Sequence, residues 1–273
     1  MQGKTVVITG ATSGIGEVAA IRLSQKGARI VLVARDKARA DATLKKLSGS
    51  GHTVRFADLS RLSGMKRLAQ ELAAEPQIDV LMNNAGALFN RREVTEDGLE
   101  KTFATNHMSY FVVTNMLLAK LKPGARIVST ASDAHKGAKL NFDDLQSEKG
   151  YSGFAVYGKS KLCNILFNRE LARRIQGTGV TANCLHPGFV ATRFGDQSGG
   201  IVSVAVRVAK PLGAISPERG AQTMIYLASS PDVANVSGKY FYKCEIATPA
   251  SEAQDDAAAR RLWEESVKLS GVG

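Results

Sequence analysis

The chain has 273 residues, of which 44% are hydrophobic and 22% are charged, and 36 Lys and Arg against 25 Asp and Glu give a formal net charge of +11. These proportions are those of ordinary globular proteins, which excludes global disorder, and the glycines follow no three-residue period, which excludes a collagen-like chain. Three cysteines, Cys163, Cys184 and Cys244, are too few for a disulfide scaffold, and they form no C-x-x-C pair, which argues against a zinc knuckle and a redox dithiol. Free thiols are typical of a reducing compartment, so we expect a cytoplasmic protein.

Short apolar runs alternate with longer amphipathic runs along the chain. The expected strands are residues 4–9, 28–34, 53–56, 78–82, 126–130, 180–185 and 240–242, and the expected helices are 15–26, 36–47, 62–74, 98–121, 154–175, 218–228 and 257–269. Apolar strands that alternate with helices indicate a parallel sheet covered on both faces. No repeat or linker divides the chain, so the pattern predicts a single α/β domain over residues 1–273, a doubly wound Rossmann-type fold.

The chain offers no segment that reads as a membrane span. The first apolar run begins almost at the first residue, and the longest uncharged stretch, residues 102–119, is interrupted by Asn106, His107, Ser109 and Asn115. We therefore expect a soluble protein without a signal peptide or a stable membrane anchor.

The positive charge is concentrated in the first fifth of the chain. Residues 1–60 hold ten Lys and Arg against four Asp and Glu, a balance of +6, whereas the remaining 26 and 21 give +5. There is no block of basic residues and no basic–aromatic interleaving, so we expect no nucleic-acid partner. A site for a phosphorylated small molecule in this part of the chain is the alternative, and solvated helix faces account for much of the charge in either case.

A glycine-rich segment follows the first expected strand and opens the first expected helix. Such a turn presents backbone N–H groups and the positive end of a helix to a pyrophosphate. Gly10 would allow the tight turn, Gly14 would let the backbone approach phosphate, and Gly16 would let the helix pack on the strand. The spacing, G-x3-G-x-G, differs from the common G-x-G-x-x-G fingerprint. The full set of expected cofactor contacts here is Gly10, Thr12, Ser13, Gly14, Ile15 and Gly16.

The end of the second strand bears on which dinucleotide binds. An acid there accepts from the ribose 2′-hydroxyl of NAD, whereas an Arg accommodates the 2′-phosphate of NADP. Ala34 occupies the position of the acid and Arg35 follows it, which favours NADP(H) over NAD(H). The alternatives are that Asp36 accepts from the ribose while Arg35 is a surface charge, or that Asp36 caps the next helix.

Two further polar segments follow strands and would lie at the carboxyl edge of the sheet, where ligands bind in such folds. Asp58 is a candidate acceptor for the adenine amino group, and Leu59 is a candidate to pack on the adenine ring. The Asn83–Gly86 turn, with Asn84, Ala85 and Gly86 as expected contacts, would lie near the ribose and nicotinamide.

The most informative local pattern is Tyr157 and Lys161, four residues apart on an expected helix and so on one face. A free tyrosine has a pKa of about 10 and is a poor acid–base catalyst at neutral pH. A nearby ammonium would lower that pKa toward the working range. Ser132, at the end of the strand 126–130, is the expected partner that hydrogen-bonds a substrate oxygen, and Ser129 is the substitute.

These motifs in this order (TGATSGIG, NNAG, Asn106, Ser132 and YGKSK) resemble the short-chain dehydrogenase/reductase superfamily. The resemblance implies a seven-stranded parallel sheet, a nicotinamide cofactor, and a catalytic tetrad that maps onto Asn106, Ser132, Tyr157 and Lys161, with Asn106 holding a water that links Lys161 to solvent. Pro187, Gly188 and Thr192 resemble the segment that holds the nicotinamide amide. The stretches around Asp133–His135 and Lys159–Phe167 resemble the retinol dehydrogenase and WW-domain oxidoreductase branch.

The resemblance implies reversible carbonyl/alcohol interconversion, with homodimers or homotetramers built through the two long helices. The apolar composition of residues 189–210 favours an apolar small-molecule substrate. A lid over residues 189–215 is expected to cover the substrate, with Phe189, Phe194 and Leu140 as candidate lining residues. The alternatives are a C=C reductase on the same fold, a non-catalytic NADP-binding sensor or scaffold, and a nucleic-acid-binding protein. The four histidines show no ligand spacing, so no metal is expected.

Overall fold

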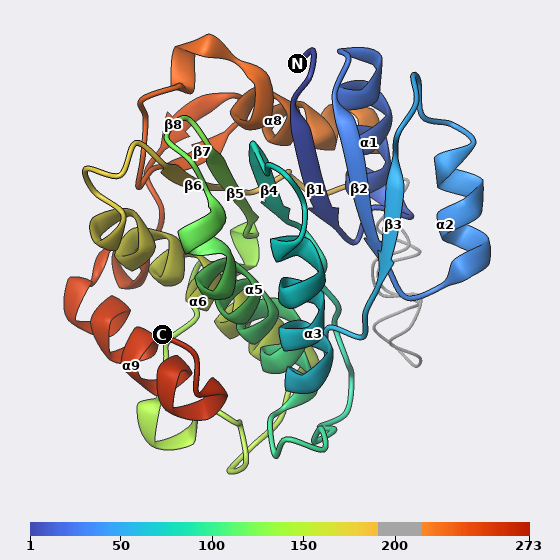
Figure 1. Ribbon diagram of the computed structural model, residues 1–273. Coiled ribbons are helices and arrows are strands. Elements are labelled where there is room, and N and C mark those ends of the chain that lie inside the picture. Colours follow the sequence, from blue (N-terminus) through green and yellow to red (C-terminus); the bar gives the residue numbers. More distant parts are fainter. Residues whose placement is uncertain (191–214) are drawn as a thin grey trace.

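A single twisted sheet forms the middle of the molecule (Figure 1). The computed structural model describes residues 1–190 and 215–273, and within them the strand order is β3-β2-β1-β4-β5-β6-β7-β8. All neighbouring strands are parallel except β7 and β8, which are antiparallel. The strands are β1 Thr5–Thr9, β2 Arg29–Ala34, β3 Thr53–Phe56, β4 Val80–Asn83, β5 Arg126–Thr130, β6 Thr181–Leu185, β7 Tyr240–Tyr242 and β8 Glu245–Ala247.

The predicted α/β fold and its seven parallel strands are confirmed, and β8 is an eighth strand that the sequence analysis missed. A two-residue turn, Lys243 and Cys244, joins β7 to β8, and both residues have positive φ, 51° and 65°. Tight hairpin turns of this kind usually carry Asn or Gly, which tolerate positive φ. Because β8 has only three residues and its turn lacks Asn or Gly, the sequence contains no pattern that predicts this strand.

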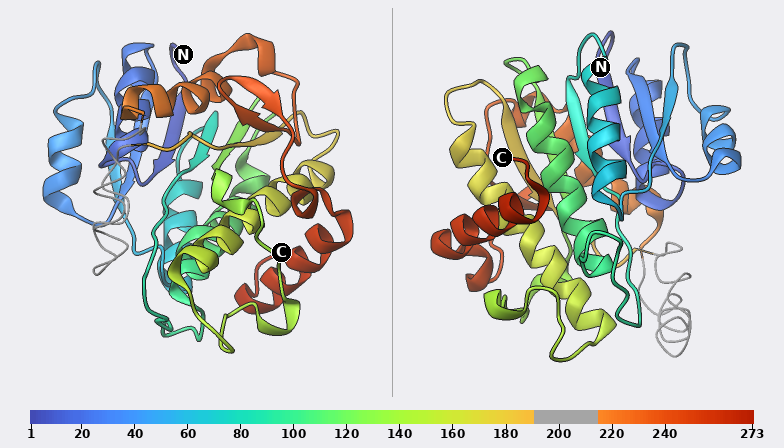
Figure 2. Two further views of the ribbon diagram at one scale, coloured as in Figure 1. Left: turned by 180° about the vertical axis from the view of Figure 1, so that it is seen from behind. Right: turned by 60° about the horizontal axis from the view of Figure 1, so that its bottom comes forward.

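Helices cover both faces of the sheet (Figure 2). One face carries α3, α5 and α6 side by side, with α9 packed along α6, and the other carries α1 and α8, which contact each other. The helices are α1 Gly14–Gln25, α2 Lys37–Leu44, α3 Leu62–Ala73, α4 Lys101–Phe103, α5 Ser109–Leu117, α6 Gly153–Arg174, α8 Pro217–Ser229 and α9 Asp256–Ser270. Short 3-10 turns lie at Leu118–Lys120, Asp133–His135, Phe142–Asp144, Pro231–Val233 and Ser251–Gln254.

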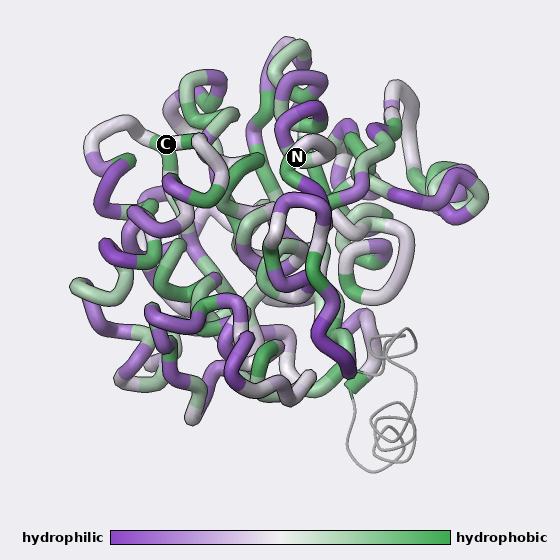
Figure 3. The backbone as a smooth tube through the Cα atoms, turned by 90° about the horizontal axis from the view of Figure 1, so that it is seen from below, coloured by the Kyte–Doolittle hydropathy of each residue, from purple (hydrophilic) through white to green (hydrophobic). Residues whose placement is uncertain are grey.

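The strands divide their side chains between two apolar cores. Val7 and Val31 belong to the core under α3, α5 and α6, whereas Ile8 and Leu32 belong to the core under α1 and α8. Alternation along each strand produces this division, because successive side chains point to opposite faces of a sheet. Seen from below, hydrophilic residues dominate the outer helical turns and hydrophobic residues lie toward the middle (Figure 3).

The long helix expected over residues 98–121 is interrupted. It begins as α4 at Lys101, passes through one π-helical turn, Ala104–Met108, continues as α5, and ends in a 3-10 turn. Glu100 determines the start, because its carboxylate accepts from the N–H groups of Thr102 and Phe103, both at 2.7 Å. Single π turns inside helices occur frequently at functional sites, and this one contains Asn106.

The strand order reverses direction between β1 and β4, and in open α/β sheets the crevice at such a reversal binds ligands. The loops that follow β1, β2, β4 and β5 all leave the sheet at this carboxyl edge. In the part of the chain that the structure describes, no helix is both long enough and apolar enough to span a bilayer.

Candidate active site

The glycine-rich turn between β1 and α1 is held tightly against the end of β4. Gly10 and Gly14 have φ of +66° and +57°, which favours glycine at both positions. A Cβ on Gly10 would lie 2.8 Å from Ala85 Cα, and one on Gly16 would lie 2.5 Å from Asn84 Nδ2. The turn therefore requires glycine for conformation and for close packing, and its backbone opens α1 at the carboxyl edge of the sheet, an arrangement that fits a pyrophosphate.

Thr9 and Asn84 bind this turn to the next strand. The Thr9 hydroxyl accepts from the N–H groups of Asn84 and Ala85, at 2.9 and 3.0 Å. The Asn84 amide donates to the Thr9 and Gly10 carbonyls, at 3.0 and 3.2 Å. Asn84, which was expected to contact the cofactor, thus uses both side-chain N–H groups to hold the glycine-rich turn, residues 10–16, which we call the glycine cradle. Thr9 also holds this cradle in place, and the sequence analysis did not single it out.

Asp36 caps α2, since its carboxylate accepts from the Arg39 N–H at 2.9 Å. Among the alternatives for Asp36, the helix cap is the one that the structure contains. Arg35 is exposed and leaves the end of β2 toward Asp58.

Asp58 is held as a carboxylate at the end of β3. Burial by itself would raise the pKa of Asp58, but hydrogen bonds from the Ser60 N–H and hydroxyl, followed by the charges of Arg35 and Arg61, bring that pKa below its usual value. Leu59 beside it is 7% exposed and belongs to the core, so little of its side chain is available to an adenine ring.

Tyr157, Lys161 and Ser132 meet at the carboxyl end of β5. Tyr157 and Lys161 lie on α6 and are 8% and 2% exposed, and Ser132 at the end of β5 hydrogen-bonds the Tyr157 side chain. Lys161 Nζ donates to the Thr130 carbonyl at 3.0 Å and lies 5.6 Å from the centroid of the Tyr157 ring. Lys161 is thereby fixed between its own helix and the end of β5.

Ser132 and Ser129 have different surroundings. Ser129 lies inside β5, is fully buried, and its hydroxyl has no hydrogen-bond partner among the described residues. Ser132 follows the strand, and its hydroxyl accepts from the Ala134 N–H at 3.2 Å, which leaves its own hydrogen free to donate. The geometry favours Ser132 over Ser129 as the group that faces Tyr157.

Asn106 lies in the π-helical turn and pins the loop after β4. Its side-chain oxygen accepts from the Ala87 N–H at 2.8 Å, and its amide nitrogen donates to the Ala87 carbonyl and the Ser160 hydroxyl, both at 2.9 Å. A Cβ on Gly86 would lie 3.4 Å from Lys161 Nζ and 3.5 Å from Asn106 Oδ1. Asn106 and Lys161 therefore enclose the Gly86–Ala87 backbone, and the water-holding role of Asn106 stays a prediction.

Burial controls the protonation of both catalytic candidates. It raises the pKa of Tyr157 to about 12, opposed by the hydrogen bond from Ser132, and it lowers the pKa of Lys161 to about 7. The sequence analysis expected the ammonium to lower the pKa of Tyr157, and this expectation is wrong because burial penalises the phenolate and the ammonium alike. At neutral pH Tyr157 is a protonated phenol, which suits a proton donor.

Tyr110 is a neighbour that the sequence analysis missed. Its ring centroid lies 5.6 Å from Lys161 Nζ, its hydroxyl is buried with no hydrogen-bond partner among the described residues, and burial, followed by proximity to Tyr157, raises its pKa well above the usual value. An apolar-looking helix run, Tyr110–Val113, gave no signal that its tyrosine lies beside Lys161.

The segment after β6 carries Pro187 and Gly188 to the same edge. Gly188 has a φ of +84°, and its N–H donates to His186 Nδ1 at 3.2 Å. His186 also stacks on Tyr242, with ring centroids 4.1 Å apart. Thr192, Phe194 and nearly all of the expected lid over 189–215 lie outside the described residues.

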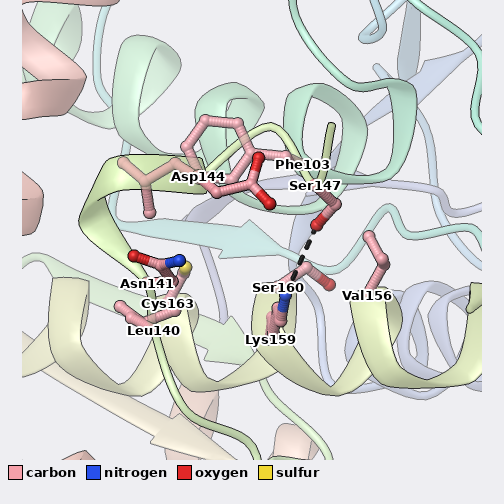
Figure 4. Close-up of a pocket in the computed structure, with 10 residues that line it drawn as sticks. Phe103, Leu140, Asn141, Asp144, Ser147, Val156, Lys159, Ser160 and Cys163 are labelled. Carbon is pink, nitrogen blue, oxygen red and sulfur yellow. Dashed lines mark hydrogen bonds between the residues drawn. The ribbon is translucent and has the colours of Figure 1, made fainter. Parts of the chain in front are cut away.

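A small cavity lies against α6, and its lining includes none of Ser132, Tyr157 and Lys161 (Figure 4). It has a volume of about 10 Å³, room for a single water molecule, between the 140–147 segment and α6. Lys159 and Ser147 meet across it at 3.5 Å, and Leu140 lines it, so Leu140 lies against the core rather than facing the site. Within residues 1–190 and 215–273, no three His, Cys, Asp or Glu side chains group as metal ligands.

Comparisons with known proteins agree with this geometry. The family model of short chain dehydrogenases matches residues 4–199. Human retinol dehydrogenase 14 is 43% identical over 299 aligned positions, covering 100% of this chain and 88% of that protein. A solved structure of an uncharacterised protein from Mycobacterium paratuberculosis superimposes with a TM-score of 0.82 at 30% identity, covering 99% of this chain and 94% of that one.

A solved structure of an actinorhodin polyketide ketoreductase variant with NADPH superimposes with a TM-score of 0.68 at 26% identity, covering 88% of this chain and 97% of that one. The glycine cradle after β1, the Tyr157–Lys161 pair beside Ser132, and the match over most of the sequence lead to one assignment. The chain belongs to the short-chain dehydrogenase/reductase family of oxidoreductases.

Proposed function

We propose that this chain is an NADP(H)-preferring oxidoreductase that interconverts a ketone or aldehyde and an alcohol on an apolar small molecule. The observation that carries the proposal is the meeting of Ser132, Tyr157 and Lys161 at the edge of the sheet that also holds the glycine cradle. This arrangement combines a proton donor, a hydroxyl that can bind the substrate oxygen, and a glycine-rich turn that fits a dinucleotide in one crevice.

Ser132 and Tyr157 divide the work on the carbonyl oxygen. Because the Ser132 hydroxyl accepts from the Ala134 N–H, its hydrogen is directed away from the backbone and can donate to the substrate oxygen. Tyr157 is protonated at neutral pH and gives its proton to the oxygen as negative charge develops on it. In the oxidative direction Tyr157 takes the proton back.

Lys161 holds the cofactor side of the crevice. Its bond to the Thr130 carbonyl uses one N–H, and the others are available to ribose hydroxyls and to Tyr157. The backbone of residues 10–16 would bind the pyrophosphate, Asp58 the adenine, and Gly86, Pro187, Gly188 and Thr192 the nicotinamide end. When bound, the nicotinamide supplies or accepts the hydride.

Arg35 supports the preference for NADP(H). It is exposed at the end of β2, on the side of the Asp58 carboxylate, and Asp36, which could have served a ribose hydroxyl, instead caps α2. The presence of NADPH in the structure of the ketoreductase relative is consistent with this preference.

Two exposed aromatic side chains support an apolar substrate. Phe154 lies one helical turn before Tyr157 on α6 and is 60% exposed, and Phe189 follows Gly188 and is 52% exposed. The human relative is a retinol dehydrogenase, so retinoids are the first substrates to examine. We also propose a cytoplasmic location, supported by three cysteines that form no disulfide.

The test is a parallel fluorescence titration of the purified protein with NADPH and NADH, followed by a panel of ketones, aldehydes, retinal and enones with the preferred cofactor. We expect tighter binding of NADPH and production of alcohols. Reduction of the enone C=C bond would favour the C=C reductase instead. Binding without turnover on any member would favour the sensor or scaffold.

A further inference from the structure

His135 joins the catalytic serine to the C-terminal part of the chain. It ends the 3-10 turn Asp133–His135 that follows Ser132, and its side chain is fully buried. Its Nδ1 lies 2.7 Å from the Ser132 carbonyl oxygen, and its Nε2 accepts from the Ala250 N–H at 3.1 Å. One imidazole thus bridges two backbone segments that are 118 residues apart, from Ser132 to Ala250.

The hydrogen-bond partners determine the tautomer of His135. A backbone N–H can only donate, so Nε2 must be the acceptor. A neutral imidazole has one acceptor nitrogen and one N–H, so Nδ1 carries the hydrogen and donates it to the Ser132 carbonyl. Burial lowers the pKa of His135, against the opposing influence of the Ser132 carbonyl and Asp133, and this favours the neutral ring that the bridge needs.

Several hydrogen bonds fix the position of Ser132. Its carbonyl accepts from both the ring and the backbone N–H of His135, at 2.7 and 3.2 Å, and its hydroxyl accepts from Ala134. The same turn presses on α6, because a Cβ on Gly158 would lie 2.5 Å from the Ala134 carbonyl oxygen. The segment Ser251–Gln254, directly after Ala250, also packs on α6, the helix that carries Tyr157.

We propose that His135 is a positioning residue of the active site: the Ala250 N–H fixes its tautomer, and its Nδ1–H holds the Ser132 carbonyl, so that the Ser132 hydroxyl stays aligned with Tyr157. The proposal rests on the proposed function of Ser132. Neither ring nitrogen is available to a substrate, since both bind backbone groups, so His135 acts through Ser132.

The chain offers a matched control in His52. His52 Nδ1 accepts from the Ile30 N–H at 3.0 Å, and its Nε2 lies 3.0 Å from the Ser48 carbonyl oxygen. It therefore makes the same two kinds of backbone contact, but at the start of β2, the opposite end of the sheet from the crevice. Loss of His52 removes comparable hydrogen bonds without touching the site.

The experiment compares two substitutions that each keep one half of the bridge. In H135N the amide nitrogen can replace Nδ1 as donor to Ser132, and in H135Q the amide oxygen can replace Nε2 as acceptor for Ala250. Misplacement of a catalytic group by about 1 Å can cost about 100-fold in rate, so we expect H135Q to lower kcat at least about 10-fold and H135N to stay within about 3-fold of wild type. The KM for NADPH should not change in either.

H52N and H52Q should lose stability in urea denaturation without loss of kcat. Equal kcat values in H135N and H135Q would overturn the proposal. The proposal would also be overturned if kcat fell in proportion to the loss of stability in the His52 variants as well as in the His135 variants. If the His135 variants do not fold, the wild-type protein still provides a test, because ¹⁵N correlation spectra of labelled histidine report the tautomer. We expect the Nδ1–H tautomer for His135, and observation of Nε2–H would contradict the bridge.

A readout without turnover separates this proposal from the proposed function. The amide of Ala134 donates to the Ser132 hydroxyl, so its ¹H–¹⁵N resonance should move in H135Q as it moves in S132A, and much less in H135N. If the wild-type enzyme turns over no carbonyl, the proposed function fails while this pattern still supports the bridge. An Ala134 resonance that responds equally to H135N and H135Q contradicts the bridge whatever the turnover.

Discussion

At the scale of single residues, the crevice depends on buried polar groups whose protonation is governed by burial. Tyr157 is kept as a phenol, with a pKa of about 12, and Lys161 has a pKa of about 7. Both side chains are buried, and each has a polar neighbour there: Ser132 hydrogen-bonds Tyr157, and the Thr130 carbonyl accepts from Lys161. Chemistry at this site therefore follows from a few side chains held in low-dielectric surroundings.

Tyr157→Phe removes the proton donor and leaves the cradle intact. General acid catalysis contributes about 10² to 10⁴-fold in rate, so we expect kcat for carbonyl reduction to fall by about that factor with NADPH affinity nearly unchanged. Tyr151→Phe is the comparison variant, because it also removes one phenol hydroxyl, which donates to the Phe89 carbonyl and not to Ser132 or Lys161. Steady-state kinetics with NADPH titration measure both variants, and retained turnover in Tyr157→Phe would falsify the role of the phenol.

Arg35→Ala tests the cofactor preference. A hydrogen bond to a charged group contributes about 1.5–3 kcal/mol, so the NADPH Kd should rise about 10- to 100-fold while the NADH Kd stays nearly constant. Lys37→Ala removes a neighbouring exposed charge, one that pairs with Asp41, and should leave both constants unchanged. A parallel loss of NADPH and NADH binding in Arg35→Ala would show that Arg35 does not read the 2′-phosphate.

At the scale of elements, the π-helical turn between α4 and α5 links the crevice to the C-terminal helix. It holds Asn106 against Ala87 on one side, and its next residue, His107, pairs through Nε2 with the Ser266 hydroxyl of α9 at 2.9 Å. His107 is fully buried among Phe103, Phe111 and Phe167. Burial lowers the pKa of His107 to about 3.

This burial makes the fold sensitive to acid. Between pH 6.5 and about 3 the unfolded chain binds a proton on His107 that the native chain excludes, so the free energy of unfolding falls as pH falls through this window. His107→Gln should flatten that dependence by up to about 1.4 kcal/mol per pH unit. Urea denaturation at pH values from 7 to 4 measures the slope, with His52→Gln as the comparison. An unchanged slope in His107→Gln would contradict the assignment.

At the scale of the whole molecule, the C-terminal segment completes both the core and the crevice. The ring of Trp263 in α9 lies 5.0 Å from that of Phe111 in α5 and 5.8 Å from that of Phe167 in α6, and the Arg174 guanidinium lies over it. The segment before α9 reaches His135 through Ala250. Helix α9 thus covers part of the two long helices through which oligomers were expected, and the number of subunits stays a prediction.

Trp263→Ala should therefore destabilise the entire fold. Replacement of a buried Trp by Ala typically costs about 3–5 kcal/mol, and Trp263→Phe should cost less because it keeps most of the ring contacts. Trp263 is the single tryptophan of the chain, so unfolding must be followed by circular dichroism rather than by fluorescence. A loss below about 1 kcal/mol in Trp263→Ala would mean that α9 does not contribute to the core as described.

Local pattern was sufficient for most of the fold. The strands at 53–56, 126–130 and 240–242 have the predicted bounds, and α1, α3, α6 and α9 begin and end within two residues of theirs, because apolar periodicity and glycine signals act over a few residues. The candidate residues of the crevice could also be predicted, because each either follows a strand or lies on one helix face with another candidate. These are features of neighbouring residues in the chain.

Tertiary structure decided what depends on residues far apart in the sequence. The raised pKa of Tyr157, the cap role of Asp36, the interior use of Asn84, the π turn at Asn106 and the bridge from Ala250 through His135 to Ser132 all require distant segments to meet. Their physical causes are desolvation and hydrogen bonding, which depend on what surrounds a group. The sequence by itself determined which groups are present at the crevice, and only packing decided their charge, their partners and their alignment.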